Sequence, residues 1–325
     1  MMISKINSYA NNCLKMTATP KMKTLKKWGL VTIRKAWLSL IRIKVMINNR
    51  QCPACGKTSS QRVFTQKYQW VELCNNCGLG RTLPALEPTN QAERHVKIYS
   101  QENYIVNYLT NYAPYLEHSF QRGLDRIKKH KPISSRLFDI GSGFGFFLNM
   151  ANADGFVVEG IEITPCLAEE GNRRYNLKII TGDILDIELV YGKYDIVTAW
   201  DVLEHISDVD RFLRKIVHLV KQDGLFLIRV PDFSFMQNNL PREFVSSYIT
   251  GVYPLGLHEH LYHFSQKSIQ QFLLRSGFKI IEQWESQNDE YTPKDTSNYF
   301  DLLKMMGNYK LSCEINFLCR LSHSS

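Results

Sequence analysis

Three glycines spaced by two residues follow directly on an apolar segment near the middle of the chain, and this stretch constrains the fold more than any other. It reads Leu-Phe-Asp-Ile-Gly-Ser-Gly-Phe-Gly over residues 137–145. Glycine lets the backbone turn sharply and approach a ligand closely, just ahead of a helix N-terminus. A dinucleotide site would need Gly or Ala at the position of Phe146, so the pattern disfavours a nicotinamide cofactor. The stretch predicts a strand, a ligand-binding turn and a helix, in that order.

The chain from residue 135 onward alternates between apolar segments of strand length and segments with a helical pattern. Such alternation is typical of a parallel sheet with helices on both faces. Two further strands near the C-terminus are expected to pair antiparallel and to close one edge of the sheet. The predicted fold class is therefore α/β, a Rossmann-like doubly wound sheet that is mostly parallel with an antiparallel edge. The predicted strands are 136–140, 157–163, 178–181, 195–200, 224–230, 278–284 and 314–321.

Acidic side chains follow the predicted strands, at the edge where open α/β sheets bind ligands. Glu162 lies 21 residues beyond Gly141, and at this spacing a carboxylate can accept hydrogen bonds from both hydroxyls of a ribose. Asp183 and its apolar neighbour Ile184 follow the next strand, where they can face the edge and the ring of an adenine. The fourth strand leads into Asp-Val-Leu-Glu-His over residues 201–205.

These four motifs, in this order, resemble those of the class I S-adenosylmethionine-dependent methyltransferases, in particular the small-molecule branch of that family. The shared patterns are D-x-G-x-G-x-G, G-x-E, G-D-I and D-V-L-E-H. The resemblance implies S-adenosylmethionine as cofactor, with the first motif at its methionine part and the second at its ribose. It also implies that the third motif contacts adenine and that the fourth lies near the sulfonium. The cofactor-binding residues so implied are Asp139, Gly141, Gly143, Gly145, Glu162, Ile163, Asp183, Ile184, Trp200 and Asp201.

Four of the eight cysteines form two Cys-x-x-Cys pairs. Cys52 and Cys55 are separated by 18 residues from Cys74 and Cys77, and a glycine follows each pair. This spacing is typical of a four-cysteine zinc site, and residues 50–82 are therefore predicted to form a zinc ribbon. Four thiolates leave no open coordination position, so the expected Zn²⁺ is structural rather than catalytic. A redox role for one pair is the alternative, but it would need a thioredoxin-like context that the sequence lacks.

Basic residues are concentrated at the N-terminus. The first 50 residues hold eight Lys, three Arg and no acidic residue, whereas the whole chain has a formal net charge of +9. The remaining body is therefore about −2 and lacks the basic footprint of a nucleic-acid enzyme. Basic residues alternate with apolar ones over 21–44, which predicts either peripheral contact of a helix with a membrane surface or a helix packed on the body. The sequence has no apolar stretch of spanning length and no signal-peptide pattern, so we expect a cytoplasmic protein, peripheral at the inner face of the membrane if this helix binds lipid.

The predicted organisation has four parts. A basic N-terminal extension covers 1–49, the zinc ribbon 50–82, a helical cap or linker 83–133, and the class I methyltransferase domain 134–325. Within the cap, tyrosines recur every three to four residues, which indicates a helical packing face.

Histidines after the fifth strand are the candidates for catalysis. Methyl transfer from a sulfonium is an in-line displacement, so an oxygen or carbon acceptor that is not already nucleophilic must be deprotonated. The segment 257–265 reads Leu-His-Glu-His-Leu-Tyr-His-Phe-Ser and stands where this family commonly forms its acceptor-side wall. His260 is the first candidate for the catalytic base and His258 the second.

Two other roles for these side chains stay open. The histidines could instead cap the helix that begins near Ser265 and bind backbone groups. Alternatively, Asp201, Glu204 and His205 resemble a metal-binding triplet of some catechol and quinol O-methyltransferases, in which a divalent ion polarises the acceptor.

The predicted function is methylation of a small acceptor, by analogy a sugar or another intermediate of cell-envelope or secondary-metabolite synthesis. A ribosomal RNA methyltransferase is one alternative, because some such enzymes pair a Cys-rich module with this fold, but the charge of the body argues against phosphate contacts. A non-catalytic zinc-ribbon scaffold protein is the other. The intact glycine turn and Glu162 argue against a scaffold. The expected partner is thus a small molecule and not a nucleic acid.

Overall fold

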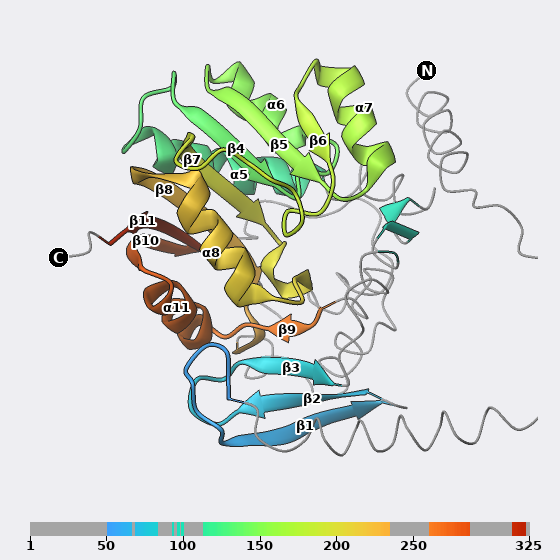
Figure 1. Ribbon diagram of the computed structural model, residues 1–325, viewed down its shortest axis with the longest axis vertical. Coiled ribbons are helices and arrows are strands. Elements are labelled where there is room, and N and C mark those ends of the chain that lie inside the picture. The colour runs from blue at the N-terminus through green and yellow to red at the C-terminus, as the bar shows by residue number, and fades with distance from the viewer. Residues whose placement is uncertain are drawn as a thin grey trace, which may run out of the picture.

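The structure is a computed structural model in which a large sheet flanked by helices and a smaller sheet are connected by one short strand (Figure 1). In the view of Figure 1 the smaller sheet lies below the larger one, and it is built mainly from strands near the N-terminus. The residues that the structure describes are 51–66, 69–83, 93, 96–97, 99–100, 113–234, 260–286 and 314–322.

All seven strands predicted from residue 135 onward are present, and together they form the large sheet. They are β4 (Arg136–Ile140), β5 (Val157–Glu162), β6 (Ile179–Thr181), β7 (Tyr194–Trp200), β8 (Val220–Pro231), β10 (Phe278–Glu285) and β11 (Glu314–Leu321). Their order is β10-β11-β8-β7-β4-β5-β6, and β4 to β8 are parallel. The order reverses at β4, which pairs with β5 on one side and β7 on the other. In open α/β sheets, such a switch point opens a ligand-binding crevice at the carboxyl ends of the strands.

Helices cover both faces of this sheet because the side chains along each strand alternate between two cores. On β8, Phe226 and Ile228 belong to one core, whereas Leu225 and Leu227 belong to the other. The first core packs against α8 (Val209–Leu219) and α11 (Gln266–Arg275), the second against α5 (Ala113–Lys128) and α6 (Phe146–Ala153), and α7 (Pro165–Tyr175) packs on β5 and β6.

The predicted antiparallel edge is confirmed, with β11 inserted between β8 and β10 and antiparallel to both. Phe317 and Leu318 of β11 have no exposed surface, so the C-terminal strand is an interior part of the sheet. β8 begins at Val220, four residues before its predicted start. The extra residues Lys221–Asp223 are polar, which is why an apolar pattern did not reveal them.

The small sheet contains β1 (Ser60–Gln66), β2 (Gln69–Cys74) and β3 (Gly80–Leu83), all antiparallel. Its fourth strand, β9 (Tyr262–His263), comes from far along the chain and pairs with β3 (Figure 1). The predicted ribbon boundary at residue 82 is therefore one residue short of the end of β3, and the contribution of β9 was not predicted. Because of β9, the two sheets form a connected structure.

Some predictions fall on residues that the structure does not describe. They include the basic extension 1–49, residues 84–92 and 101–112 of the cap, and His258. Within the cap, α5 confirms the predicted helix over its last part. Among the described residues, no helix is both long enough and apolar enough to cross a membrane.

Candidate functional site

The glycine turn connects β4 to α6 at the switch point of the large sheet. Gly141, Gly143 and Gly145 have φ angles of 71°, 52° and 73°, in the left-handed region that strains residues with a Cβ. A Cβ on Gly141 would lie 2.6 Å from the Val202 side chain, and one on Gly145 would lie 2.5 Å from Leu177. Nothing lies within 4 Å of the corresponding position on Gly143. The turn is therefore packed tightly at its two ends and open at its centre, where a ligand can approach the backbone.

Glu162 ends β5 and its side chain lies against the glycine turn. Its carboxyl group is buried, with the residue only 5% exposed. One oxygen accepts a hydrogen bond from the backbone N–H of Gly143 at 2.9 Å, and the other accepts from the N–H of Thr164 at 2.8 Å. Burial raises the pKa of Glu162, although these backbone hydrogen bonds oppose the shift. The structure thus brings together the glycine and the carboxylate that the first two motifs predicted as neighbours.

Asp139, the acidic residue of the first motif, lies within β4 and is also buried. The hydroxyl of Thr198 on β7 donates a hydrogen bond to its carboxyl group at 2.6 Å. Burial raises the pKa of Asp139 to about 8, the charge of Glu162 adds to the shift, and the hydrogen bond from Thr198 opposes it. Asp139 therefore links two central strands beneath the turn. Thr198 was not predicted, and its only signal is a hydroxyl within an apolar strand.

The remaining predicted cofactor residues lie at the carboxyl ends of the neighbouring strands. Asp183 accepts a hydrogen bond from the backbone N–H of Leu185 at 2.8 Å, which forms a tight turn after β6. Ile184 is buried in that turn, and Ile163 is partly exposed after β5. Trp200 ends β7 with 7% of its surface exposed, and its indole N–H has no hydrogen-bond partner among the described residues. These residues share one edge of the sheet with the glycine turn.

Asp201 is held by an ion pair that the sequence did not predict. The buried Arg229 on β8 donates from Nε to one carboxylate oxygen of Asp201 at 2.9 Å and from Nη2 to the other. Its third nitrogen donates to the hydroxyl of Ser119 on α5 at 3.0 Å. Both oxygens of Asp201 are thus bound to a guanidinium. Glu204 and His205, which the sequence placed in a metal triplet with Asp201, are grouped by the structure with His260 instead.

Glu204 and His205 lie close to His260 instead. The first two belong to η2 (Leu203–His205), the short 3-10 helix after β7, and His260 lies two residues before the strand β9. These three side chains offer ligand atoms that all lie within 4.8 Å of one another. The imidazole rings of His205 and His260 are 4.7 Å apart between centroids. Burial lowers the pKa of His260 well below its usual range, and the neighbouring His205 and His263 add to the shift.

Hydrogen bonds from β3 fix the backbone around His260. Thr82 donates from its N–H to the carbonyl of Leu261 at 2.9 Å and from its hydroxyl to the carbonyl of His260 at 2.8 Å. The N–H of Leu261 in turn donates to the carbonyl of Glu204 at 2.8 Å. His260 therefore lies between the small sheet and the carboxyl end of β7. Whether it acts as a base is a prediction that these contacts do not test.

The helix that was expected to begin near Ser265 is α11, and Ser265 itself is its N-cap. The hydroxyl of Ser265 accepts a hydrogen bond from the N–H of Ser268 at 3.1 Å, and it donates to the carbonyl of Cys77 at 2.6 Å. The capping role considered for the histidines is thus performed by a serine that also binds the small sheet.

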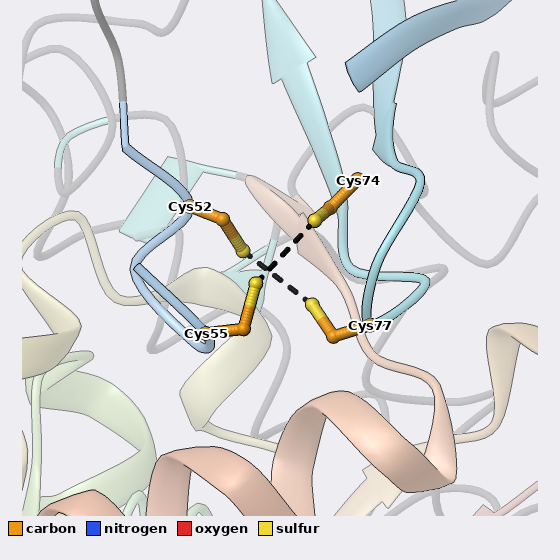
Figure 2. Close-up of side chains that lie close together, drawn as sticks. All are labelled: Cys52, Cys55, Cys74 and Cys77. Carbon is orange, nitrogen blue, oxygen red and sulfur yellow. Dashed lines mark hydrogen bonds between the residues drawn. The ribbon is translucent and has the colours of Figure 1, made fainter. Parts of the chain in front are cut away.

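The four cysteines of the two pairs point toward one centre (Figure 2). The sulfurs of Cys52 and Cys77 are 3.5 Å apart, and those of Cys55 and Cys74 are 3.6 Å apart. Four sulfurs bound tetrahedrally to zinc at about 2.3 Å would be separated by about 3.8 Å. The hydrogen bond between Cys52 and Cys77 lowers the pKa of Cys52 to about 5 and raises the pKa of Cys77 above its usual range. The residues present therefore fit a four-thiolate metal ion.

The two cysteine pairs have the same local geometry. Gly56 and Gly78 have φ angles of 71° and 74°, and their N–H groups donate to the carbonyls of Cys52 and Cys74 at 2.8 and 2.9 Å. Each glycine is needed to turn the backbone back toward its pair, because the left-handed region disfavours other residues. The sequence therefore builds two matching cysteine knuckles.

Comparison with known proteins covers mainly the large sheet. The family described as "Methyltransferase domain" matches residues 112–283, more than half of the chain. The chain is also similar to ubiquinone biosynthesis O-methyltransferases. The relative from Rickettsia canadensis is 26% identical over 174 residues, which cover 49% of this chain and 70% of the relative. The relative from Coxiella burnetii is 21% identical over 186 residues, covering 54% of this chain and 75% of the relative.

The chain is also similar to solved structures. A chain of the complex between the Haloferax volcanii Trm112 methyltransferase activator and a methyltransferase has a TM-score of 0.50 and 15% identity, and the match covers 72% of this chain and 97% of that one. An S-adenosylmethionine-dependent methyltransferase from Listeria monocytogenes has a TM-score of 0.46 and 20% identity, with coverages of 65% and 98%.

Proposed function

We propose that this chain methylates a hydroxyl group of a small acceptor. The premise is that the chain belongs to the methyltransferase-domain family and is an S-adenosylmethionine-dependent enzyme. The observation that carries the proposal is the hydrogen bond from the N–H of Gly143 to the buried carboxylate of Glu162, next to the open space over the centre of the glycine turn. A glycine N–H and an acidic side chain at the switch point of a parallel sheet are what nucleoside cofactors of this fold require.

Each part of the cofactor has its own proposed residues. Open space over the centre of the glycine turn suits the methionine part, and Glu162 suits the ribose hydroxyls because its carboxylate already lies at the turn. The turn after β6, with Asp183 and the buried Ile184, suits adenine. Trp200 and the Arg229-bound Asp201 end the strand nearest the expected sulfonium. When bound, S-adenosylmethionine supplies an electrophilic methyl group.

The four-cysteine site is proposed to hold a structural zinc ion. Its role follows from the contacts of the small sheet with the segment 260–265, which carries His260 and caps α11. Through Thr82 and the carbonyl of Cys77, the ribbon fixes the backbone of this segment. We propose that the ribbon positions one wall of the acceptor site and takes no part in the chemistry.

The acceptor is proposed to be a sugar or another small intermediate of cell-envelope or secondary-metabolite synthesis. The relatives named above are O-methyltransferases, which supports an oxygen atom as the methyl acceptor. The body after residue 50 carries about −2 charges, which disfavours the alternative of ribosomal RNA. A scaffold protein without catalysis would have no need of the open turn beside Glu162.

Calorimetric titration with S-adenosylmethionine tests the cofactor site. Gly143→Ala places a methyl group in the open space over the turn, so the affinity is expected to fall by about tenfold or more. The positive φ of 52° adds a strain of about 1–2 kcal/mol. Such a loss alone is expected to leave the protein folded at room temperature.

Gly192→Ala is the matched control, because Gly192 has a φ of 58° and likewise nothing within 4 Å of an added Cβ. Gly192 lies two residues before the amino end of β7, away from the turn. It should lose a similar amount of stability and keep its affinity. Equal affinity of the wild type and Gly143→Ala would contradict the proposed site, and no binding by the wild type would favour a scaffold.

A further inference from the structure

We infer that Glu204, His205 and His260 form a second metal-ion site, in which two imidazoles and one carboxylate bind a divalent cation between the large and small sheets. This site is distinct from the four-cysteine site in residues and in chemistry. It also differs from the triplet considered from the sequence, because Asp201 is bound to Arg229 and His260 takes its place.

The geometry of the three side chains is close to that of a metal site. Their ligand atoms lie within 4.8 Å of one another. Ligands held tetrahedrally at about 2.1 Å from one ion are about 3.4 Å apart, so shifts of about 1 Å, shared among the three side chains, would complete the coordination. The rings of His205 and His260 stand at 77° to each other, an edge-to-face arrangement rather than a stack.

Glu204 supplies an independent observation that points to a ligand. The residue is 1% exposed, and neither of its carboxylate oxygens has a hydrogen-bond partner among the described residues. A buried carboxylate with no partner is unfavourable unless a cation compensates it. The nearby guanidinium of Arg229 is already bound to both oxygens of Asp201. A divalent ion held with the two histidines would satisfy Glu204.

The backbone positions the three ligands in advance. Glu204 and His205 are adjacent in η2, and the carbonyl of Glu204 accepts the N–H of Leu261, next to His260. The hydroxyl of Thr82 donates to the carbonyl of His260. Ligands fixed in this way lose little conformational freedom when an ion binds. The ribbon therefore supports this second site through its strand β3.

The ligand set indicates the kind of ion and its use. Two histidines with one carboxylate suit Zn²⁺, Fe²⁺, Mn²⁺ or Co²⁺, and three protein ligands leave at least one position open to water or substrate. The next step rests on the proposed function: an acceptor hydroxyl bound there would lose its proton to water more readily. Its oxygen would then form a bond to the methyl carbon as the carbon–sulfur bond breaks, giving a methyl ether, S-adenosylhomocysteine and a released proton. In this mechanism His260 binds the ion instead of acting as the base.

Metal titration of the full-length protein tests the inference. The protein is dialysed against a mild chelator, its remaining zinc is measured, and Mn²⁺ or Co²⁺ binding is followed by equilibrium dialysis. One further ion per chain is expected in the wild type. Glu204→Gln and His260→Gln should each weaken binding of this ion by about 100-fold or more. Even the loss of a residue that only hydrogen-bonds to a metal ligand weakens metal binding by about 10–100-fold. His218→Gln, which changes a histidine on α8 outside the cluster, should bind as the wild type does.

Further readouts separate the possible outcomes. Asp201→Asn should still bind the ion. If Asp201→Asn instead loses the ion while His260→Gln keeps it, the assignment is overturned in favour of the triplet of Asp201, Glu204 and His205. After chelation, Glu204→Gln should have a melting temperature no lower than that of the wild type, because the substitution removes an unpaired buried carboxylate. When the ion is added, the melting temperature of the wild type should rise and that of Glu204→Gln should not.

Absence of a second ion at up to about 1 mM free Mn²⁺, Co²⁺ or Zn²⁺, or full binding by Glu204→Gln, would refute the site. If Glu204→Gln does not fold, His260→Gln alone decides between these outcomes. Titration with S-adenosylmethionine in parallel reports on the proposed function separately.

Discussion

At the scale of single residues, the buried acidic side chains fall into two groups. Glu159 and Glu170 are bound by lysine or arginine side chains. Asp139, Glu162 and Glu204 are buried more deeply, and no ion pair is found for them among the described residues. The negative charges of the first group are neutralised by these basic side chains, which stabilises the fold. The second group lies at the proposed cofactor site and at the proposed site of Glu204, His205 and His260.

Glu159 belongs to the stabilising group and has a defined pH dependence. Burial raises its pKa, but hydrogen bonds from Lys193, Tyr194 and Lys178 outweigh this effect and lower it to about 2. A carboxyl group whose folded pKa is depressed stabilises the protein above its unfolded pKa, and this contribution is lost as the pH falls through the folded pKa. Glu159→Gln is therefore expected to lower the free energy of unfolding at pH 7 by about 1–3 kcal/mol.

Urea unfolding at pH 7 and at pH 3 measures this contribution. The difference between wild type and Glu159→Gln should shrink at pH 3, which lies inside the window between about 4.5 and 2. Glu188→Gln, at an exposed position, should change little at either pH. A difference of the same size at both pH values would show that the ion pairs of Glu159 are not its source.

Contacts between single residues can be anticipated from the sequence where the fold class alone determines the geometry. The glycine turn and Glu162 belong to adjacent strand ends, so their approach follows from the fold class alone. The pairing of Arg229 with Asp201 depends on the register of β7 against β8. The approach of His260 to Glu204 depends on the pairing of β9 with β3. Neither of these contacts has a signature in local spacing.

At the scale of elements, the strands with buried faces were predicted to within a few residues because apolar side chains mark them. β9 is the exception: it has two residues and no periodicity, and it is a strand only because β3 offers an edge. Its pairing brings the cysteine-containing sheet next to His260. The ribbon could be predicted from its cysteines, but the partner of its edge strand could not.

Loss of the four-cysteine metal site is expected to release β3 from β9. A segment of this size cannot be held by its own core, so the ion should supply most of its stability. In Cys74→Ser, the bound zinc should be lost, and the amides of Thr82 and Leu261, which lie at the junction, should exchange with deuterium much faster. Amides of β8, in the large sheet, should stay protected.

Cys166→Ser is the control for this experiment, because Cys166 is buried in α7 outside the cysteine cluster. It should retain zinc and the protection of Thr82. Retention of zinc by Cys74→Ser, or unchanged exchange at Thr82 after its loss, would contradict the proposed role of the ribbon.

At the scale of the whole molecule, the distribution of charge bears on the acceptor. Eleven basic residues lie within the first 50 positions, and the rest of the chain is close to neutral. An enzyme that binds RNA through 6–10 phosphates loses about 10³–10⁵-fold in affinity between 50 and 200 mM salt. Methyl transfer to a small acceptor should change little over the same range.

Labelling a cell extract with radioactive S-adenosylmethionine measures this difference. The label is expected in the low-molecular-weight fraction, with a similar yield at 50 and 200 mM salt, and ribonuclease treatment should not reduce it. Label in the RNA fraction with a steep loss at high salt would support the ribosomal RNA alternative instead.

The pairing of β3 with β9 also determines when the molecule can be completed during synthesis. The hydroxyl of Thr82 and the carbonyl of His260 are 178 residues apart, so at about 5–20 residues per second the edge of β3 emerges about 10–40 s before its partner. An unpaired edge invites pairing with other chains. β3 is only four residues long, and Arg81 on it forms an ion pair with Glu72 on β2, features that discourage such pairing. Both knuckles are complete by Gly78, so the proposed zinc ion could bind first, and the ribbon would then present a short, charged edge until β9 is synthesised.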